Sequence, residues 1–319
     1  MNKFKNYLSD GIARIRNTRK PSTHRLWATT ASFGLVLIFT VVAARADGKR
    51  PFRFSPKPAP HAIAVQSDTT KDFVPPTVFQ TAGPTVASIQ SSVDAFRAAL
   101  GNPNNGNASG PLATGRREIN WDGGGANDTT TDPVTPFNVF LNTRGGQFTT
   151  PGIGLSQAPP SGGPQGGLAV LFNNPSYGTI FTAFSPLRLF TPVGSNITDA
   201  LFFLPGSNGN VPATVSGFGA VFSDVDQPDG SGPDKKRGNR GASTLISFFG
   251  ADGELLFSSV VPASPGDRSL SFFGIIFNDA RIARVRITAG NVAPGPDDDR
   301  TNDIVMMDDF IYGEPQTIP

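Results

Sequence analysis

The feature that most constrains the fold is the alternation of short apolar runs with turn-forming clusters after about residue 117. The runs are separated by Gly, Pro, Asn and Asp, in a chain that holds 36 Gly and 29 Pro among 319 residues. Ten runs at this spacing are typical of antiparallel strands joined by turns. The candidate strands are 137–141, 168–172, 179–184, 198–204, 213–222, 243–249, 254–261, 270–277, 282–288 and 304–312.

Local patterns inside these runs support strands over helices. Basic and aliphatic residues alternate over 284–287, which is the period of a strand with one buried face. Asp252-Gly253 lies between two runs and is a strong hairpin signal. No long strand–helix–strand unit is visible. We therefore predict an all-β fold, an antiparallel, jelly-roll-like β-sandwich that forms a single domain over 77–319.

Phenylalanine dominates the aromatic residues, with 26 Phe against three Tyr and two Trp. A Phe ring has no polar tip, so it belongs in a dry core. Neighbouring strand residues point to opposite faces. One member of each Phe pair can fill the space between the sheets, and the other needs cover from the helix, a loop or a partner. The pairs are Phe202-Phe203, Phe248-Phe249 and Phe272-Phe273.

One amphipathic helix is predicted over 88–100, before the sandwich. Ser88 is a candidate N-cap, and Gly101 follows the last apolar position. The apolar residues at helical spacing are Ile89, Val93, Phe96 and Leu100.

The first 46 residues have the pattern of an export signal. A basic stretch precedes the uncharged residues 26–44, and Ala44-Arg45-Ala46 fits the small-x-small site of signal peptidase. The alternative is an uncleaved N-terminal anchor, since nineteen uncharged residues approach the span of a bilayer. In either case we expect the rest to lie outside the cytoplasm, secreted or at the cell surface. Residues 47–76 are rich in Pro, Lys, Ser and Thr and are predicted to form a disordered linker.

Removing the leader reverses the net charge. The whole chain carries +2, but the first 46 residues hold eight of its 27 basic residues and one of its 25 acidic residues, so the remainder carries −5. A nucleic-acid-binding domain is expected to be basic. The one basic run, at 235–240, stands among Gly, Pro and Asp and is predicted to be a solvated loop. Nucleic acid is therefore not an expected partner.

Few catalytic groups are present after the leader. His61 is the only histidine there, it lies in the linker, and the chain has no Cys. A Ser-His-Asp triad and a zinc site of His and Cys are therefore not expected. A glycosidase needs only two carboxyls across a cleft. The glutamates available for one are Glu118, Glu254 and Glu314.

Calcium suits an exported domain that is rich in Asp and lacks Cys, because it binds six to eight oxygen ligands. Asp224 and Asp226 end a strand, and 297–303 forms a second acidic stretch, which is predicted to be a solvated loop. Adjacent strand residues Asp308 and Asp309 face opposite sides, so one carboxylate should point inward toward a metal ion or an Arg. The predicted calcium ligands are Asp122, Asp224, Asp226, Asp308 and Asp309.

An aromatic platform for sugar rings would need exposed Trp or Tyr side chains. After the leader the candidates are Trp121, Tyr177 and Tyr312. A core position is an equal interpretation for Trp121, whose surroundings alternate as a strand does. The scarcity of Trp and Tyr counts against a sugar-binding module.

Several stretches resemble a group of uncharacterised exported bacterial proteins, some of which carry a PEP-CTERM sorting tail. The resemblance covers most of the chain from about Val93 onward and implies an exported β-sandwich, with no activity to carry over. This chain departs from the group after Glu314-Pro315, where no apolar segment follows, so sorting through the C-terminus is not expected. The similar stretches are 116–123, 184–186, 189–191, 194–199, 217–226 and 307–315.

Three function classes follow. The first is a non-catalytic exported β-sandwich that binds extracellular polysaccharide or another envelope component, or is structural at the cell surface, with calcium as its one candidate cofactor. The second is a carboxylate-based glycosidase or lyase. The third is a self-assembling surface protein, which requires an exposed Phe-rich face or an unpaired edge strand. Membrane contact is expected only through an uncleaved leader.

Overall fold

A computed structural model describes residues 74–123, 128–226, 244–299 and 301–318. The predicted leader, nearly all of the predicted linker, and the basic run at 235–240 lie outside the described residues. Among the residues that are described, no helix is long and apolar enough to cross a membrane.

The described chain forms two large antiparallel sheets and one short strand pair. The strands of the larger sheet are β1 (Thr77–Gly83), β2 (Arg116–Ile119), β4 (Gly154–Ala158), β5 (Leu189–Val193), β8 (Gly217–Ser223), β11 (Leu270–Ile276) and β13 (Met306–Gly313). The strands of the smaller sheet are β3 (Gly146–Thr149), β6 (Ile197–Phe202), β9 (Leu245–Phe249), β10 (Leu255–Val260) and β12 (Arg284–Thr288). The short pair is β7 (Ala213–Thr214) with β14 (Gln316–Thr317).

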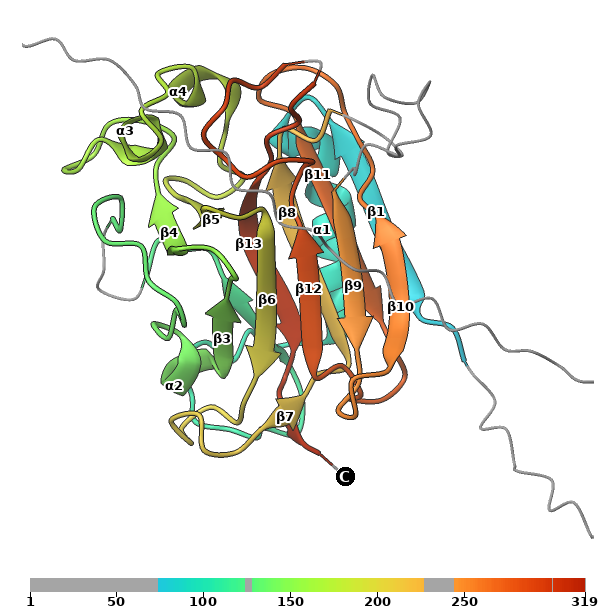
Figure 1. Cartoon of the computed structure of the whole chain (residues 1–319). Helices are drawn as coiled ribbons and strands as arrows, with labels where there is room; N and C mark the ends of the chain where they lie inside the picture. The colour runs from blue at the N-terminus through green and yellow to red at the C-terminus, as the bar shows by residue number, and fades with distance from the viewer. Residues whose placement is uncertain (1–73, 124–127, 227–243, 300, 319) are drawn as a thin grey trace, which may run out of the picture. The chain divides into compact units, whose positions relative to one another are not determined.

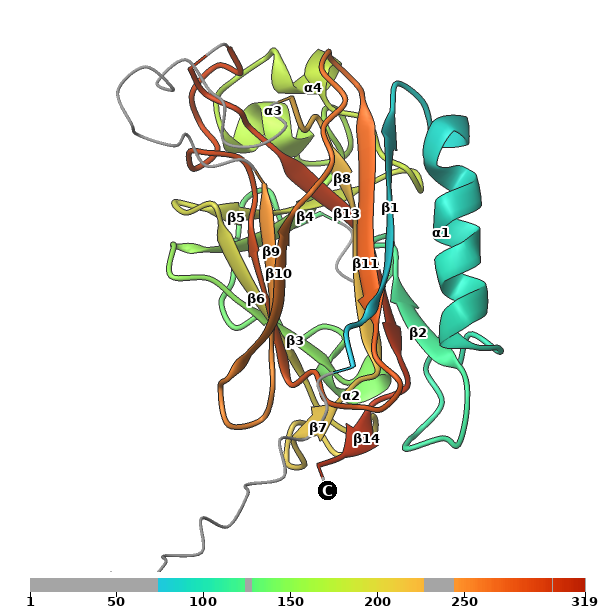
Figure 2. The ribbon, with the colours of Figure 1, turned by 90° about the vertical axis from the view of Figure 1, so that its right-hand side faces the viewer.

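The two sheets face each other as the layers of a sandwich (Figures 1 and 2). The larger sheet runs in the order β1-β11-β8-β13-β5-β4, with β2 also paired to β13, and the smaller sheet runs β10-β9-β12-β6-β3. All the pairings between these strands are antiparallel. The predicted all-β antiparallel sandwich is confirmed.

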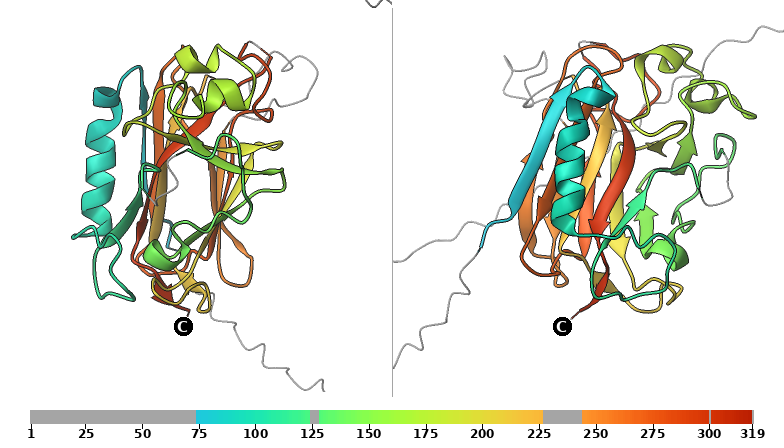
Figure 3. Two further views of the ribbon diagram at one scale, coloured as in Figure 1. Left: turned by 90° about the vertical axis from the view of Figure 1, so that its left-hand side faces the viewer. Right: turned by 180° about the vertical axis from the view of Figure 1, so that it is seen from behind.

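Four helices accompany the sheets: α1 (Val86–Leu100), α2 (Leu141–Arg144), α3 (Gly167–Leu171) and α4 (Tyr177–Ile180). Helix α1 covers the outer face of the larger sheet (Figure 3). It does not simply precede the sandwich as predicted, because β1 comes before it and pairs with β11. The N-cap is Thr85 in place of the predicted Ser88, and the Thr85 side chain accepts a hydrogen bond from the Ser88 amide.

The pairs Phe248-Phe249 and Phe272-Phe273 each place one ring between the sheets and the other on the outer face of a sheet. Phe273 lies in the inter-sheet core, and Phe272 packs under α1 with the helix residue Phe96. Phe248 is buried between the sheets, while Phe249 faces outward beneath the Arg284 guanidinium, 3.9 Å from its ring centre. The helix and an arginine thus supply the cover that the sequence pattern requires.

Two glycines allow α1 to approach the sheet closely. Gly219 on β8 pairs directly with Gly274 on β11. An added Cβ at Gly219 would stand 2.8 Å from the Phe96 ring, and one at Gly274 would stand 2.9 Å from it. The Phe96 ring therefore rests on a patch of bare backbone, which fixes the position of the helix C-terminal half.

Three predicted strands are wrong. Most of the run 168–172 lies in the helical turn α3. Of the run 179–184, the first two residues end α4 and the other four form a loop. The run 137–141 gives only an isolated bridge at Phe137 before α2. Runs this short fit a buried strand or a buried helical turn equally well. Here α3 and α4 bury one side each in a third apolar cluster with Leu189, Ile304 and Met306.

Several short strands were not predicted from the sequence, namely β1, β2, β3, β4 and β5. Strands β3 and β4 are interrupted by Gly and polar residues, so their apolar content is low. The predicted hairpin at Asp252-Gly253 is confirmed: it joins the paired strands β9 and β10, and Gly253 has a φ of 88°.

Two of the exposed apolar residues, Leu245 on β9 and Val260 on β10, lie opposite each other in the smaller sheet. Where the structure describes the chain, the exposed large hydrophobic side chains are Val, Leu and Ile, and none is Phe. Strand β10 ends the smaller sheet and exposes Leu255 and Val260, while β1 ends the larger sheet. The phenylalanine side chains that the structure describes are thus all buried or half-buried.

Candidate functional site

The three residues predicted as a sugar platform are corrected to core positions. Trp121, Tyr177 and Tyr312 each have 0% exposed surface. Trp121 stacks on Phe190, with ring centres 3.7 Å apart, inside the inter-sheet core. These side chains are buried because packing each aromatic ring against apolar partners removes a large apolar surface from water.

The five predicted calcium ligands do not converge. Within the described ranges, no group of three or more acidic or imidazole side chains has the arrangement of a metal site. Asp122 instead shapes a loop: its Oδ1 accepts hydrogen bonds from the Leu187 amide at 2.8 Å and the Arg188 amide at 3.1 Å.

Asp308 and Asp309 lie together on β13 at a break in its pairing with β8. The register shifts between Asp308 and Phe310, which is the mark of a β-bulge. Both carboxylates consequently reach Ser185. Asp308 accepts hydrogen bonds from the Phe184 and Ser185 amides, while Asp309 binds Arg97 at 3.0 Å. The sequence left a metal ion or an Arg as the partner of the inward carboxylate. For Asp309 that partner is Arg97.

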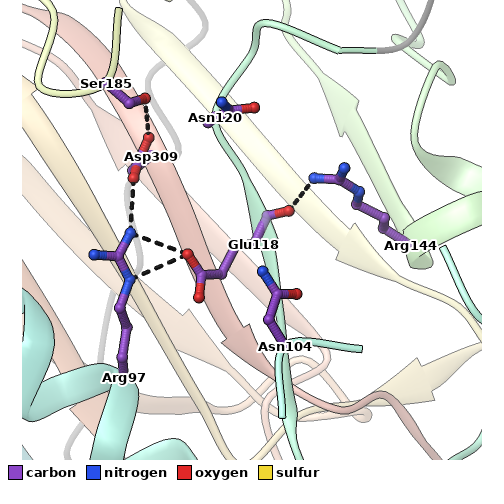
Figure 4. A pocket seen from close by; sticks show the side chains of 7 residues that line it. All are labelled: Arg97, Asn104, Glu118, Asn120, Arg144, Ser185 and Asp309. Atoms are coloured by element: carbon purple, nitrogen blue, oxygen red, sulfur yellow. Dashed lines mark hydrogen bonds and ion pairs between the residues drawn. The ribbon is translucent and has the colours of Figure 1, made fainter. Parts of the chain in front are cut away.

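A polar pocket of about 340 Å³ lies beside this bulge (Figure 4). We call it the Arg97 pocket. It is bounded by the C-terminal half of α1, by the end of α2, by β2 and by β13, with three loops completing the wall. All of its lining residues are polar or charged: Arg97, Asn104, Glu118, Asn120, Arg144, Ser185 and Asp309.

Arg97 holds the two acidic residues of the pocket together. Its Nη2 lies 3.0 Å from Glu118 Oε2 and 3.0 Å from Asp309 Oδ2. The second Glu118 oxygen accepts a 2.6 Å hydrogen bond from Arg116, and the Asp309 Oδ1 accepts one from Ser185. Each oxygen of the two carboxylates therefore has a donor within the protein.

Burial shifts the titration of the two aspartates on the bulge. It raises the pKa of Asp308 well above the usual range, and the neighbouring Asp309 carboxylate adds to this shift. Burial also raises the pKa of Asp309, against the opposing effects of the Ser185 hydrogen bond and the Arg97 charge. The bulge thus concentrates acidic groups that resist ionisation at the wall of the pocket.

A second polar region lies where loops meet beyond the end of β8. Asp224 follows this strand, is 0% exposed and has a φ of 70°. Asp226 joins two other loops, since its amide donates to Asp303 Oδ1 at 3.2 Å and its Oδ1 accepts from the Gly266 amide at 2.8 Å. Two acidic stretches that the sequence separates, 224–226 and 297–303, are brought together here.

Glu314, one of the three candidate catalytic glutamates, has a structural role. It forms a bidentate ion pair with Arg117, with 2.6 Å between the nitrogen and oxygen atoms of each contact. Both side chains are almost fully buried. Glu254 is exposed next to the hairpin turn. Only Glu118 lines the Arg97 pocket.

Sequence reasoning missed most of this pocket. Arg97 lies on the predicted helix, but its partners Glu118 and Asp309 are 21 and 212 residues away. No spacing pattern connects positions that meet only through sheet packing. The nearest signal was Asp309 itself, whose place on a strand required a buried partner.

The fold and the pocket define an all-β antiparallel sandwich with a helix packed on one sheet and a polar pocket at the end of that helix. Neither a protein-family model, nor a curated protein, nor a solved structure matches this chain.

Proposed function

We propose that this chain is an exported, non-catalytic β-sandwich protein that binds a hydroxyl-rich ligand in the Arg97 pocket. Extracellular polysaccharide and other envelope glycans are ligands of this class. Export is supported by the basic, apolar and small-residue pattern of residues 1–46.

The composition of the Arg97 pocket carries the proposal. Its volume of about 340 Å³ falls in the range of small-molecule sites, about 300–1,000 Å³. Its wall presents guanidinium, carboxamide, carboxylate and hydroxyl groups, and no apolar side chain is among the lining residues. Such a wall offers donors and acceptors in many directions, which matches a ligand with several hydroxyl groups.

The hydrogen bonding favours binding over catalysis. Arg97 and Arg116 engage both oxygens of Glu118. Ser185 and Arg97 engage both oxygens of Asp309. A carboxylate held by two donors is a rigid acceptor for a ligand hydroxyl, whereas a nucleophile or proton donor needs an oxygen directed at the substrate.

Binding can be tested with the full chain on soluble polysaccharides of neutral, uronic-acid and amino-sugar composition. Asn120 is exposed at the pocket rim. We expect Asn120→Ala to weaken binding about fivefold to tenfold, the loss of roughly one hydrogen bond. Asn210, exposed on a loop outside the pocket lining, gives the matched control Asn210→Ala. Equal weakening by both variants, or no binding by the wild type, would contradict the proposal.

A carboxylate-based glycan-active enzyme is the second candidate. Two carboxyls in one pocket favour it, since Glu118 and Asp309 both approach the same Arg97 nitrogen. Asp309, whose pKa burial raises, would be the proton donor, and Glu118 would be the nucleophile or base.

The second candidate is tested by release of reducing ends from the same polysaccharides. If the chain is an enzyme, Glu118→Gln and Asp309→Asn will each abolish release while a bound polysaccharide is retained. Binding without any release by the wild type would eliminate the enzyme and keep the binding protein.

A further inference from the structure

We propose that the loops around Asp224 hold a calcium ion, at a site separate from the Arg97 pocket. We call these residues the Asp224 cluster: Asp224, Asp226, Asp267, Asp298 and Asp303. They come from three loops, at 224–226, at 264–269 and at 297–303.

The first argument is the state of Asp224 itself. Its side chain is fully buried, and neither carboxylate oxygen has a hydrogen-bond partner in the described part of the chain. Burying a carboxylate without a donor or a counter-charge is costly. The residue also holds a left-handed φ of 70°, which is an unfavourable conformation for a residue other than glycine. An aspartate kept in this position needs a compensating partner.

The second argument is the charge around it. The negative charges of Asp298, Asp226, Asp267 and Asp303 all act on the buried Asp224 carboxylate. The charges of Asp226 and Asp267 act in the same way on Asp298. Several carboxyls from separate loops thus share one region, and a divalent cation would reverse this repulsion.

The third argument is that the loops are already connected. Asp226 binds the amide of Gly266 and donates its own amide to Asp303. Asp298 accepts a 2.8 Å hydrogen bond from the Ile304 amide. The Asp224 amide donates to the Ser269 carbonyl at 3.0 Å. These bonds hold the acidic residues of the three loops beside the end of β8.

Calcium is the ion that suits this donor set. The cluster offers carboxylates without any His or Cys, and calcium accepts carboxylate, carbonyl and water oxygens in flexible geometry. In the described chain no three acidic side chains yet stand at metal-ligand geometry. We therefore expect Asp224 and one neighbouring carboxylate to bind the ion directly, with backbone carbonyls and water as the remaining ligands.

The experiment is a calcium titration of the chelator-treated full chain, followed by calorimetry and by thermal unfolding. We expect one ion per chain and a Tm rise of about 5–10 °C at a calcium concentration about 100 times Kd. Magnesium at the same concentration should give a smaller rise, because it demands stricter geometry.

Matched variants test whether Asp224 is a ligand. Asp224→Asn preserves shape and removes the charge, and we expect it to weaken calcium binding at least tenfold. Asp132→Asn is the control, since Asp132 is exposed and outside the cluster. Asp298→Asn serves as a second variant if Asp224→Asn does not fold, and it too should weaken binding.

Two results would overturn the proposal. One is a wild type that shows neither heat of binding nor a Tm shift with calcium, which would make Asp224 a buried neutral acid. The other is that Asp224→Asn and Asp298→Asn bind calcium with the same affinity as the control Asp132→Asn. Neither result bears on polysaccharide binding, because the Arg97 pocket shares no residue with the Asp224 cluster.

Discussion

Trp121 lies flat against Phe190, with ring centres 3.7 Å apart and planes inclined by 3°. Phe148 and Phe310 meet the same indole edge-on, at 5.2 and 4.9 Å. The indole is thus the centre of an aromatic cluster between the sheets. Its contribution is to stability and not to ligand contact.

We expect Trp121→Ala to lower the free energy of unfolding by about 3–5 kcal/mol, the usual cost of removing a buried aromatic ring. Urea denaturation followed by far-ultraviolet circular dichroism measures this loss. Val170→Ala is the control, because Val170 is 60% exposed. A loss below about 1 kcal/mol for Trp121→Ala would show that the cluster is not the core.

The buried ion pair gives a second prediction. Glu314→Gln leaves the Arg117 guanidinium buried without its counter-charge, and we expect a loss of about 3–5 kcal/mol in urea denaturation. Asp199→Asn is the comparison, because Asp199 pairs with Arg284 and Arg286 on the outer sheet face. Arg286 is 45% exposed, so solvent screening limits this cost to about 1 kcal/mol or less. Equal losses of stability in Glu314→Gln and Asp199→Asn would contradict this distinction between a buried and a partly exposed ion pair.

The glycine pair under α1 gives a third prediction. Gly219→Ala puts a methyl group against the Phe96 ring, and we expect a loss of about 1–3 kcal/mol from overpacking. Gly274→Ala should behave in the same way. Gly123→Ala is the control, since an added Cβ there would meet only one atom, at 3.9 Å. Thermal unfolding should also show that Phe96→Leu restores part of the stability lost by Gly219→Ala.

The pH dependence of stability follows from Asp308. Burial and Asp309 raise its pKa in the folded state, so the folded chain holds this proton more tightly than the unfolded chain. Its contribution to stability is complete below the ordinary Asp pKa of about 3.9 and is lost as pH rises through the folded-state pKa. Asp309, whose pKa is also raised, acts with the same sign.

We therefore expect the free energy of unfolding of Asp308→Asn to fall less steeply above pH 4 than that of the wild type. Urea denaturation at several pH values measures the slope. Asp132→Asn should run parallel to the wild type. If the free energy of unfolding of Asp308→Asn falls with pH as steeply as that of the wild type, another group controls stability in this pH range.

The sandwich itself was predictable because strand patterns are local. The alternation over 284–287 became β12, and Asp252-Gly253 became the turn between β9 and β10. The need for cover over Phe272 and Phe249 also followed from strand geometry. Local patterns failed at 168–172, where a short apolar run fits two structures and packing against β5 and β13 selected the helical turn α3. They also failed at 179–184, where the chain leaves α4 after Ile180 and continues as a loop.

The candidate sites required the tertiary structure. By itself the sequence determined the β-sandwich class, the presence of one amphipathic helix where α1 lies, and the acidic character of the chain after residue 46. It did not reveal that Arg97 bridges Glu118 and Asp309, or that Asp224 meets the loop of Asp298 and Asp303. Those relations depend on strand order and on one bulge in β13, which bring together residues that are distant along the chain. The alternation around Trp121 suggested a strand, but Trp121 follows the end of β2 and has a φ of 62°. Only the packing of both sheets decided that it lies in the core.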